Sequence, residues 1–324
     1  MGDQLALVTG ATGAIGPRLV AELIQQGWQV RVLSRQRPTK PLFPDGVEFI
    51  PGDIGDREIV RAAVADAQLV FHLAALLHVT NPPPELRAEY ERVNVDATRI
   101  VAQEAASASV QRMIYFSTVK VYGVQQAQPV TEDNALDPKT DYAKSKLSGE
   151  RAALDHMETT ILRLSPIYGA RLRGSWRYLV TGINKGLFLP VGSLKNTRSL
   201  THVDDASKAA LLVANSPSCA NQAYNLVAHD SVNMEAILDA IYAAFGKRRP
   251  RIGIPAPLVH GGVGLAEIGL GLIGKRSPLT RESIGQLTQS ETYSGAKLRA
   301  LGFQPQVSLA EGWQQTVKAI LAET

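Results

Sequence analysis

Cysteine is nearly absent from the sequence: Cys219 is the single one among 324 residues. One thiol cannot form a disulfide within the chain, which excludes the disulfide-stapled scaffolds of small secreted proteins. The N-terminal segment MGDQLALVTG also lacks the basic stretch and the apolar run of a secretory signal. We therefore expect a cytoplasmic protein.

Blocks rich in lysine and arginine are missing as well. The formal net charge is +4, from 34 basic and 30 acidic residues, and the basic residues are scattered along the chain. Nucleic-acid binding needs a basic patch that follows the phosphate backbone, so it is not expected here. With 45% hydrophobic and 20% charged residues, the chain is long enough for one large domain, alone or with a smaller one.

No hydrophobic run is long enough to cross a membrane. The most apolar segment, LVHGGVGLAEIGLGLI at 258–273, contains His260 and Glu267 and several glycines, whereas a span needs about 20 apolar residues. We expect an apolar helix that packs on the protein or covers a ligand, with peripheral membrane contact as the alternative. The histidines show no paired ligand spacing, so no metal site is predicted.

Short apolar runs alternate with helical patterns in the first half of the chain. The runs are LALVTG, QVRVLSR, VEFIPGD, AQLVFHLAA, VQRMIYFST and ETTILRLSPIYG, and helical patterns such as 17–26 and 94–107 lie between them. This rhythm predicts an α/β fold with a doubly wound parallel sheet. After about Gly169 it loosens, so we predict a dinucleotide-binding domain over 1–169, to which segments near 199–228 return. The rest of 170–324 is predicted to form a smaller substrate-binding lobe.

A glycine triad follows the first apolar run. Gly10, Gly13 and Gly16 in TGATGAIG stand between the first predicted strand and the first predicted helix. In a dinucleotide loop the first glycine permits the tight turn, the second lets the backbone approach the pyrophosphate, and the third lets helix and strand pack closely. The free N–H groups at the start of the helix then face the phosphates. This context favours a dinucleotide-binding loop over an ordinary strand-to-helix turn.

The end of the second predicted strand indicates which dinucleotide is bound. An acidic residue there would hydrogen-bond the ribose 2′-hydroxyl of NAD, but the segment reads VLSRQR and has no carboxylate before Asp45. The Ser34 hydroxyl and the Arg35 guanidinium suit a 2′-phosphate. NADP(H) is therefore favoured and NAD(H) stays possible, because Arg35 and Arg37 could also be solvated loop charges.

The stretch DYAKSK sets a phenol four residues before an ammonium. On a helix, Tyr142 and Lys146 project from the same face. A nearby ammonium stabilises a phenolate and lowers the pKa of the phenol, which makes tyrosine usable as an acid or base in hydride transfer. The hydroxyl of Thr118, at the end of a predicted strand, is placed to hydrogen-bond the same substrate oxygen. Alone, such a pair is more often a surface contact of a helix.

Seven motifs in order resemble the extended short-chain dehydrogenase/reductase superfamily, of the NAD-dependent epimerase/dehydratase type. They are TGATGAIG, GDIGD, FHLAA, FSTVKVYG, YAKSK, LRLSPIYG and SLTHVDDASKA, and the resemblance runs from residue 5 to about residue 320. It implies a Rossmann sheet, an enzyme that uses NAD(P), and a catalytic triad of Thr118, Tyr142 and Lys146. Ser117 is the neighbouring, weaker candidate for substrate contact.

The resemblance also implies roles for further residues. Lys146 would lower the pKa of Tyr142 and hold the nicotinamide ribose, and Asn94 would fix the active-site backbone, unless it is a helix N-cap for the segment after it. Together with the glycine loop, the predicted cofactor contacts are Gly10, Thr12, Gly13, Ala14, Ile15, Gly16, Ser34, Arg35, Asp53, Ile54, Leu73, Ala74, Ala75, Asn94, Tyr142, Lys146, Pro166 and Ile167.

Departures from the family pattern narrow the reaction. Dehydratases of this superfamily place an Asp-Glu pair directly after the catalytic threonine, and this chain has Val119 and Lys120 there. Dehydration is therefore disfavoured, and net ketone reduction, alcohol oxidation or epimerisation remain. A further arginine that many UDP-galactose epimerases carry is missing from GQLTQSETYSGAKL, which weakens the 4-epimerase reading in particular.

The second lobe is most similar to bacterial UDP-N-acetyl-hexosulose 4-ketoreductases and their epimerase relatives. There Arg198 would reach the diphosphate of a UDP-sugar, unless it forms a structural ion pair with Asp204 or Asp205. His78 could touch substrate, although a satisfied polar loop residue is the simpler interpretation. The apolar segment at 258–273 keeps a hydroxysteroid-dehydrogenase-like enzyme as an alternative, and a non-catalytic NADP-binding regulator is the alternative of another class. Relatives dimerise through helices that include the one bearing Tyr142, so we expect a homodimer.

Overall fold

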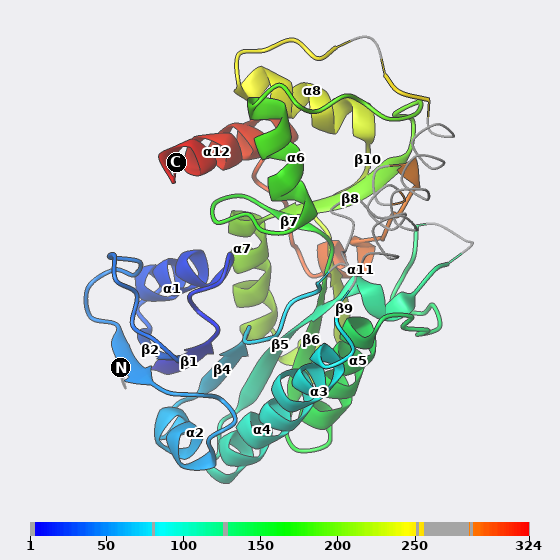
Figure 1. Cartoon of the computed structure of the whole chain (residues 1–324). Helices are drawn as coiled ribbons and strands as arrows, with labels where there is room; N and C mark the ends of the chain where they lie inside the picture. The colour runs from blue at the N-terminus through cyan, green and yellow to red at the C-terminus, as the bar shows by residue number, and fades with distance from the viewer. Residues whose placement is uncertain are drawn as a thin grey trace.

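The computed structural model describes residues 4–79, 82–125, 129–250, 253–255, 285 and 288–323. The apolar segment 258–273, for which a helix was predicted, lies outside these ranges. Figure 1 shows a large sheet flanked by helices and a smaller group of strands and helices beside it.

The large sheet has seven strands, all parallel. Their order is β3 (Glu48–Pro51), β2 (Gln29–Ser34), β1 (Leu5–Thr9), β4 (Leu69–His72), β5 (Arg112–Thr118), β6 (Thr159–Leu164) and β9 (Ala223–Leu226). β1 and β4 are buried along their whole length, which explains their continuous apolar runs, because a parallel sheet is covered on both faces. The predicted doubly wound α/β fold is confirmed.

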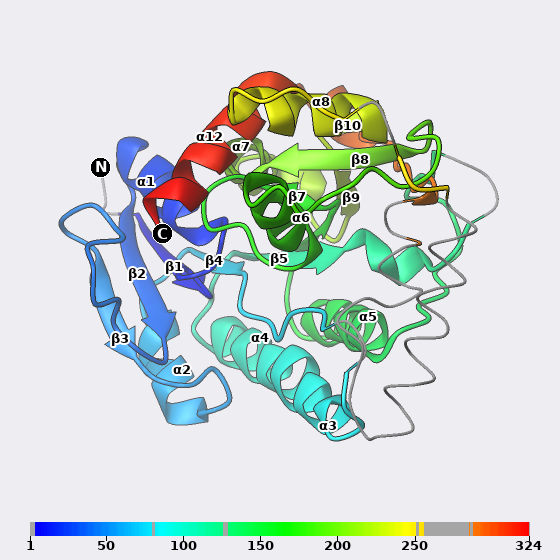
Figure 2. The ribbon, with the colours of Figure 1, turned by 45° about the horizontal axis from the view of Figure 1, so that its top comes forward.

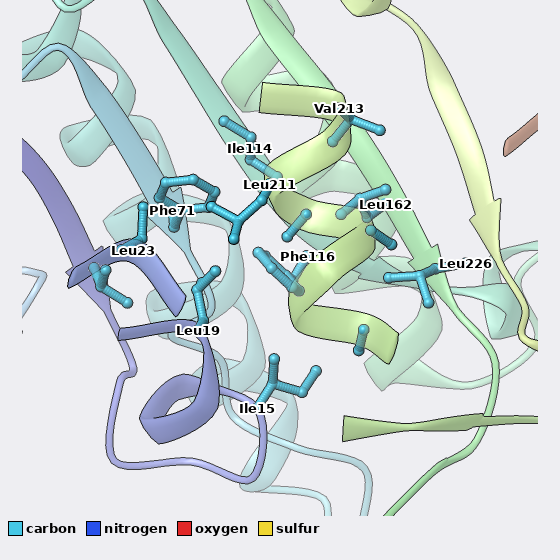
Figure 3. Close-up of a cluster of buried hydrophobic side chains, with 14 of the residues drawn as sticks. Ile15, Leu19, Leu23, Phe71, Ile114, Phe116, Leu162, Leu211, Val213 and Leu226 are labelled. Atoms are coloured by element: carbon cyan, nitrogen blue, oxygen red, sulfur yellow. The ribbon is translucent and has the colours of Figure 1, made fainter. Parts of the chain in front are cut away.

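Alternate residues of each strand supply two hydrophobic cores. Ala6 and Val8 of β1 pack with α1 (Gly16–Gln25) and α7 (Val203–Ala214), as Figure 3 shows for the side chains between these helices and the sheet. Leu5 and Leu7 face the opposite core with α2 (Arg57–Val64), α4 (Ala97–Ser107) and α5 (Asp141–Leu154). Successive side chains of a strand point to opposite faces, so the two layers of helices follow from the period of the sheet.

Local capping places the helices that carry functional residues. Asp56 accepts hydrogen bonds from the N–H groups of Glu58 and Ile59 at the start of α2, and Thr140 accepts one of 3.1 Å from Ala143 at the start of α5. Side-chain acceptors of this kind satisfy the free donors of a first helical turn. The short α3 (Leu86–Glu91) continues directly into a π-helical turn, Arg92–Asp96, before α4.

A second sheet has three strands in the order β10 (His229–Asn233), β8 (Thr197–His202) and β7 (Ile167–Tyr168), with β10 antiparallel and β7 parallel to β8. Trp313 lies at 0% exposure in the core between these strands and α6 (Ser175–Asn184), α8 (Met234–Ala244) and α12 (Leu309–Ala322). Figure 2 shows α8 and α12 together along one side of this sheet. The remaining elements are α11 (Ala296–Ala300) and 3-10 turns at Val119–Tyr122 and Pro217–Cys219.

The segment after residue 169 divides between the two sheets. α7 packs on the first core and β9 forms the edge of the large sheet, whereas α6, α8 and α12 share the second core. The predicted domain boundaries themselves stay a prediction. None of the helices within the described ranges is long and apolar enough to cross a membrane.

Candidate active site

A cavity of about 470 Å³ lies at the carboxyl ends of the parallel strands. Of the residues predicted to contact a dinucleotide, those lining it are Gly10, Thr12, Gly13, Ala14, Ile15, Ser34, Arg35, Asp53, Ile54, Leu73, Ala74, Ala75, Tyr142, Lys146 and Ile167. This edge of an open parallel sheet is the usual place for a ligand. Gly16, Asn94 and Pro166 were also predicted to contact the cofactor but do not line this cavity.

The glycine loop is shaped by backbone contacts that leave no room for larger residues. Gly10 has φ of +68°, and a Cβ on it would lie 2.5 Å from the backbone nitrogen of Ala74. Gly13 donates a 3.0 Å hydrogen bond to the Gly10 carbonyl, and a Cβ on Gly16 would overlap the backbone of Ala11. Only glycine tolerates such close approach. The loop therefore forms a cradle whose backbone lies close to Ala74 and Ala11.

The start of α1 offers donors to this cradle. Ile15 stands at the N-cap and makes no side-chain cap hydrogen bond. The first N–H groups of the helix lack intrahelical acceptors, and the helix dipole favours an anion there. Arg171 closes the loop from the other side by donating a 2.9 Å hydrogen bond to the Thr12 carbonyl. The residues present thus fit the pyrophosphate of a dinucleotide.

The outer end of the cavity is charged. Ser34 and Arg35 line it at the end of β2, and Asp53 lines it after β3. Arg92 also lines the cavity and pairs with Asp53 at 3.8 Å and with Glu89 at 3.0 Å. The sequence analysis did not single out Arg92 or Glu89, because neither belongs to a motif that was recognised.

Asn94 acts beneath the cavity rather than in it. Its side chain is fully buried, accepts a 2.7 Å hydrogen bond from the Leu76 N–H, and donates to the Leu76 carbonyl at 3.1 Å and to Ser145 at 2.9 Å. It therefore ties a cavity-lining loop to α5. The alternative that Asn94 is a helix N-cap is wrong, because it lies inside the π-helical turn that joins α3 to α4.

Tyr142 lies where this cavity meets a second one of about 680 Å³. Thr118, His78 and Pro166 line only the second cavity, whereas Ser117 and Ile167 line both. The His78 ring meets the Tyr142 ring edge to face, with centroids 5.7 Å apart. The structure thus brings together the residues predicted for catalysis and those predicted for substrate contact, except that Arg198 lies with a group of charges described below.

Burial has the largest effect on the pKa of Tyr142. Burial raises the pKa of Tyr142 to about 12, against a hydrogen bond from the Thr118 hydroxyl that lowers it. The Lys146 ammonium lies 4.0 Å from the centroid of the Tyr115 ring. The pKa of Tyr142 therefore lies above its ordinary value, since removal from water favours the neutral phenol. That Lys146 lowers this pKa stays a prediction.

Burial disfavours the charged form of Lys146. It is 1% exposed, and burial lowers its pKa to about 7, although Glu150 acts in the opposite direction. The same desolvation, helped by Lys146, lowers the pKa of His72 to about 3. A buried ammonium close to its titration point is more often found at a functional site than in a core.

The Ser117 hydroxyl belongs to a buried hydrogen-bond network. Its hydroxyl donates to Glu150, which also accepts from Arg163 at 2.8 Å and 3.1 Å. Arg163 in turn donates a 2.9 Å hydrogen bond to the Tyr122 hydroxyl. Because the Ser117 hydroxyl already has this acceptor, Thr118 is the hydroxyl available beside Tyr142.

The second cavity combines an apolar wall with one group of charges. Its aromatic and aliphatic lining is formed by Trp176, Tyr178, Leu179, Leu187, Phe188, Leu189, Val191 and Ile254. Opposite them Glu291 accepts from Lys120 at 2.9 Å and from Arg198 at 2.7 Å. Burial would raise the pKa of Glu291, but Lys120 and Arg198 outweigh it and hold that pKa below its usual value.

Arg198 has a different partner from the one considered in the sequence. It pairs with Glu291, and not with Asp204 or Asp205, so that alternative is wrong. Arg198 is 4% exposed, and its Nε has no hydrogen-bond partner within the described ranges. Sequence reasoning missed Glu291 because it is 93 residues away from Arg198 and belongs to no recognised motif.

The described residues contain no metal-binding cluster.

The chain matches the family model described as NAD dependent epimerase/dehydratase family over residues 6–226. It is 29% identical to UDP-glucose 4-epimerase of Vibrio cholerae, over 97% of this chain and 95% of that protein. It is 26% identical to N-acetyl-alpha-D-glucosaminyl-diphospho-ditrans,octacis-undecaprenol 4-epimerase of Escherichia coli O157:H7, over 98% and 95% of the two chains.

Two further comparisons concern cofactor and substrate. The solved structure of MoeE5 in complex with UDP-glucuronic acid and NAD has a TM-score of 0.77 and 26% sequence identity, and the match covers 100% of both chains. The 3 beta-hydroxysteroid dehydrogenase/Delta 5-->4-isomerase of Mycobacterium tuberculosis (strain CDC 1551 / Oshkosh) is 29% identical over 78% of this chain and 73% of that protein. The predictions of the superfamily and of an enzyme are confirmed: this chain is an enzyme of the extended short-chain dehydrogenase type and belongs to the NAD-dependent epimerase/dehydratase family.

Proposed function

We propose that the protein transfers hydride, with NADP(H) as its preferred cofactor, at a sugar carbon of a nucleotide sugar, as a 4-ketoreductase or an epimerase. The observation that carries this proposal is the position of Tyr142, whose ring lines both the cavity of the glycine loop and the cavity with Arg198. A proton donor at such a junction can serve a substrate oxygen beside a nicotinamide.

Different residues of the first cavity would bind different parts of the cofactor. The glycine loop and the start of α1 would bind the pyrophosphate, and Asp53 and Ile54 would contact the adenine. Ser34 and Arg35 would bind a 2′-phosphate, and Lys146 would hold the nicotinamide ribose. When bound, the nicotinamide supplies the hydride or takes it up. NADP(H) is proposed because the end of β2 presents a guanidinium and a hydroxyl and no carboxylate.

Tyr142 would move the proton. With its pKa near 12, the phenol is protonated at neutral pH, which is the form that gives a proton to a carbonyl oxygen during reduction. The Thr118 hydroxyl, hydrogen-bonded to the phenol, would steady both that oxygen and the phenolate left behind. The ammonium form of Lys146, which is readily gained at neutral pH, would favour the phenolate once it forms.

The second cavity would hold the sugar and its carrier. Arg198 would donate forked hydrogen bonds to the diphosphate, which its unpartnered Nε supports. Lys120 lies two residues after Thr118, where the dehydratase pattern has acidic residues. An ammonium cannot serve as a base for the elimination of water, so reduction or epimerisation is favoured over dehydration. The likeness to two 4-epimerases and to a protein crystallised with a UDP-sugar supports this substrate class.

A second candidate is oxidation or reduction of a hydrophobic hydroxy or keto compound. The mostly apolar lining of the second cavity favours it, as does the similarity to a hydroxysteroid dehydrogenase. In that case Arg198 and Lys120 would stay paired with Glu291 and would not contact substrate.

Calorimetric titration distinguishes these functions. NADPH and NADH are titrated into the protein, each with and without a panel of UDP-sugars, and nicotinamide absorbance is followed in the same samples. Tighter binding of NADPH, and its oxidation by a UDP-4-ketosugar in wild type but not in Tyr142→Phe, supports the ketoreductase. Interconversion of UDP-sugars without net absorbance change supports an epimerase. Cofactor binding with no response to any UDP-sugar contradicts the proposal and directs the panel to steroids and other hydrophobic ketones.

A further inference from the structure

Large hydrophobic side chains that face solvent gather at one opening. In the part of the chain that the structure describes, ten of them are exposed, and five of the ten line the second cavity. These five, called here the apolar collar, are Leu77 (51% exposed), Tyr178 (80%), Leu187 (79%), Leu189 (51%) and Ile254 (36%). Scattered exposed leucines need no explanation, but a group of them around a cavity marks an interaction surface.

Tyr178 of the apolar collar lies on a firmly packed helix, and Leu187 and Leu189 follow that helix. Leu179, Val180 and Ile183 of α6 are buried in the core shared with α8 and α12, which Figure 1 shows on the same side of the molecule. Tyr178 lies on the same helix but is exposed, and Leu187 donates a 2.9 Å backbone hydrogen bond to Gly182. The exposure of Tyr178 and Leu187 therefore belongs to a packed helix and the turn after it.

Exposed ammonium groups lie beside the apolar collar. Between Glu158 and Asp204 the sequence contains no acidic residue and seven basic ones, of which Arg163, Arg177 and Arg198 pair with Glu150, Glu323 and Glu291. Lys185, at the end of α6, is exposed beside Leu187. Lys247 adds a second exposed ammonium there, because its Nζ donates a 2.8 Å hydrogen bond to the carbonyl of Asn184.

We propose that the apolar collar docks on the surface of an anionic lipid bilayer. Tyrosine and leucine side chains enter the headgroup region, and flanking lysines bind lipid phosphates while their stems stay apolar. A second copy of the chain fits less well, since an interface formed by this face of two copies would gather the Lys185 and Lys247 cations of both. Docked in this way, the opening of the second cavity faces the membrane, so a sugar on a membrane-anchored diphosphate can enter it directly.

Vesicle co-sedimentation tests the docking. The full-length protein, loaded with NADPH, is centrifuged with vesicles of phosphatidylcholine and with vesicles that also contain phosphatidylglycerol. We expect binding to the anionic vesicles only, weakened by added salt, because each lysine near an anionic surface contributes about 1 kcal/mol. Tyr178→Ser with Leu187→Ser should lower the bound fraction about tenfold, as should Lys185→Glu with Lys247→Glu. Val124→Ser, at a side chain 84% exposed outside the apolar collar, should change nothing.

Two controls make the outcome decisive. Calorimetric binding of NADPH, which depends on the other cavity, shows that each variant is folded. Sedimentation equilibrium of each variant reports the oligomeric state. Absence of wild-type binding to anionic vesicles overturns the proposal, and so does binding that survives the collar substitutions. A change from dimer to monomer in the collar variants, without effect on vesicles, assigns the apolar collar to a subunit interface instead. None of these outcomes depends on the reaction proposed above.

Discussion

Asn94 and Ser145 are joined by a 2.9 Å hydrogen bond between two buried side chains, 51 residues apart in the sequence. Ser145 stands three positions after Tyr142 in α5, and Asn94 also holds the backbone of Leu76 in the cofactor cavity. The π-helical turn that contains Asn94 thus fixes the distance between the cavity wall and the helix of the candidate proton donor.

Replacing Asn94 by alanine leaves the Leu76 backbone without its buried partners. Each unsatisfied buried group costs about 1–3 kcal/mol, so Asn94→Ala should lower the free energy of unfolding by about 2–4 kcal/mol and weaken NADPH binding. Asn94→Asp keeps the acceptor for the Leu76 N–H and should lose less. Urea unfolding and calorimetry on the same samples check this. Unchanged NADPH affinity in Asn94→Ala would show that the turn stabilises the fold without shaping the cavity.

The contact between Tyr142 and Thr118 predicts how kcat/KM depends on pH. Oxidation of an alcohol requires the phenolate, so kcat/KM in that direction should rise with pH toward the high pKa of Tyr142. Thr118→Val removes the hydrogen bond that lowers this pKa, so its profile should move to higher pH, with a rate about 10–100-fold lower. Thr118→Ser keeps a hydroxyl and should resemble wild type. A Thr118→Val profile that coincides with that of wild type argues against this role for the hydroxyl.

Lys146 should lower the free energy of unfolding at neutral and acidic pH. Its pKa falls from the ordinary 10.5 to about 7 in the folded protein, so the unfolded chain binds more protons between these values and stability rises with pH there. Lys146→Met, which removes the penalty, should therefore stabilise the protein by about 2–5 kcal/mol below pH 7, and the gain should vanish near pH 10.5. Lys144→Met, exposed on the same helix, is the control. Denaturant unfolding at several pH values measures both, and equal shifts in the two variants would contradict the assignment.

The glycine loop, the parallel sheet and the position of Tyr142 could be predicted because they depend on local sequence. Buried strands read as apolar runs, and Gly10 occupies a turn that only glycine fits. Partnerships across the fold could not be predicted. Lys120 and Glu291 are 171 residues apart, and nothing in either segment indicates the other. The raised pKa of Tyr142 could not be predicted for a related reason, since the burial that causes it depends on how the whole chain packs around the phenol.

The net charge of the whole chain gave no indication of the basic side chains that lie beside the apolar collar. Basic residues look scattered when the whole chain is counted, yet the stretch from Glu158 to Asp204 contains no acid between its ends. Only the fold shows that α6 and the segment after it carry Tyr178, Leu187 and Leu189 of the apolar collar, and that Lys247, which follows α8, lies beside them. Surface charge is a property of arrangement in space, which a count along the sequence does not report.

Arg35 should decide between the two nicotinamide cofactors. It lines the cavity at the end of β2, where a guanidinium would pair with a 2′-phosphate. Arg35→Ala should weaken NADPH binding about tenfold and leave NADH binding nearly unchanged. Arg37→Ala is the matched control, because Arg37 lies over the Phe49 ring at 5.0 Å. Equal losses of affinity for NADPH and NADH would show that Arg35 does not distinguish a 2′-phosphate from a 2′-hydroxyl.

Glu291 should oppose the binding of an anionic substrate. It is the only acidic residue among the described residues that line the second cavity, and it is shared by Lys120 and Arg198. Glu291→Gln frees both cations, so the affinity for UDP should rise about five- to tenfold while that for uridine stays constant. The same change leaves the buried Arg198 without its counter-ion and should lower the free energy of unfolding by about 3 kcal/mol.

Calorimetry with UDP and uridine separates charge from fold, because a damaged cavity would lose both ligands together. Lys120→Met should lower UDP affinity in the Glu291→Gln background more than in wild type, since only there is the ammonium released from its carboxylate. Glu58→Gln, in an exposed pair on α2, is the control and should alter neither ligand. If Glu291→Gln binds UDP no better than wild type, the diphosphate does not reach these cations. Their charge then serves only to join the 3-10 turn after β5 to β8 through Glu291, which favours the neutral, hydrophobic substrate.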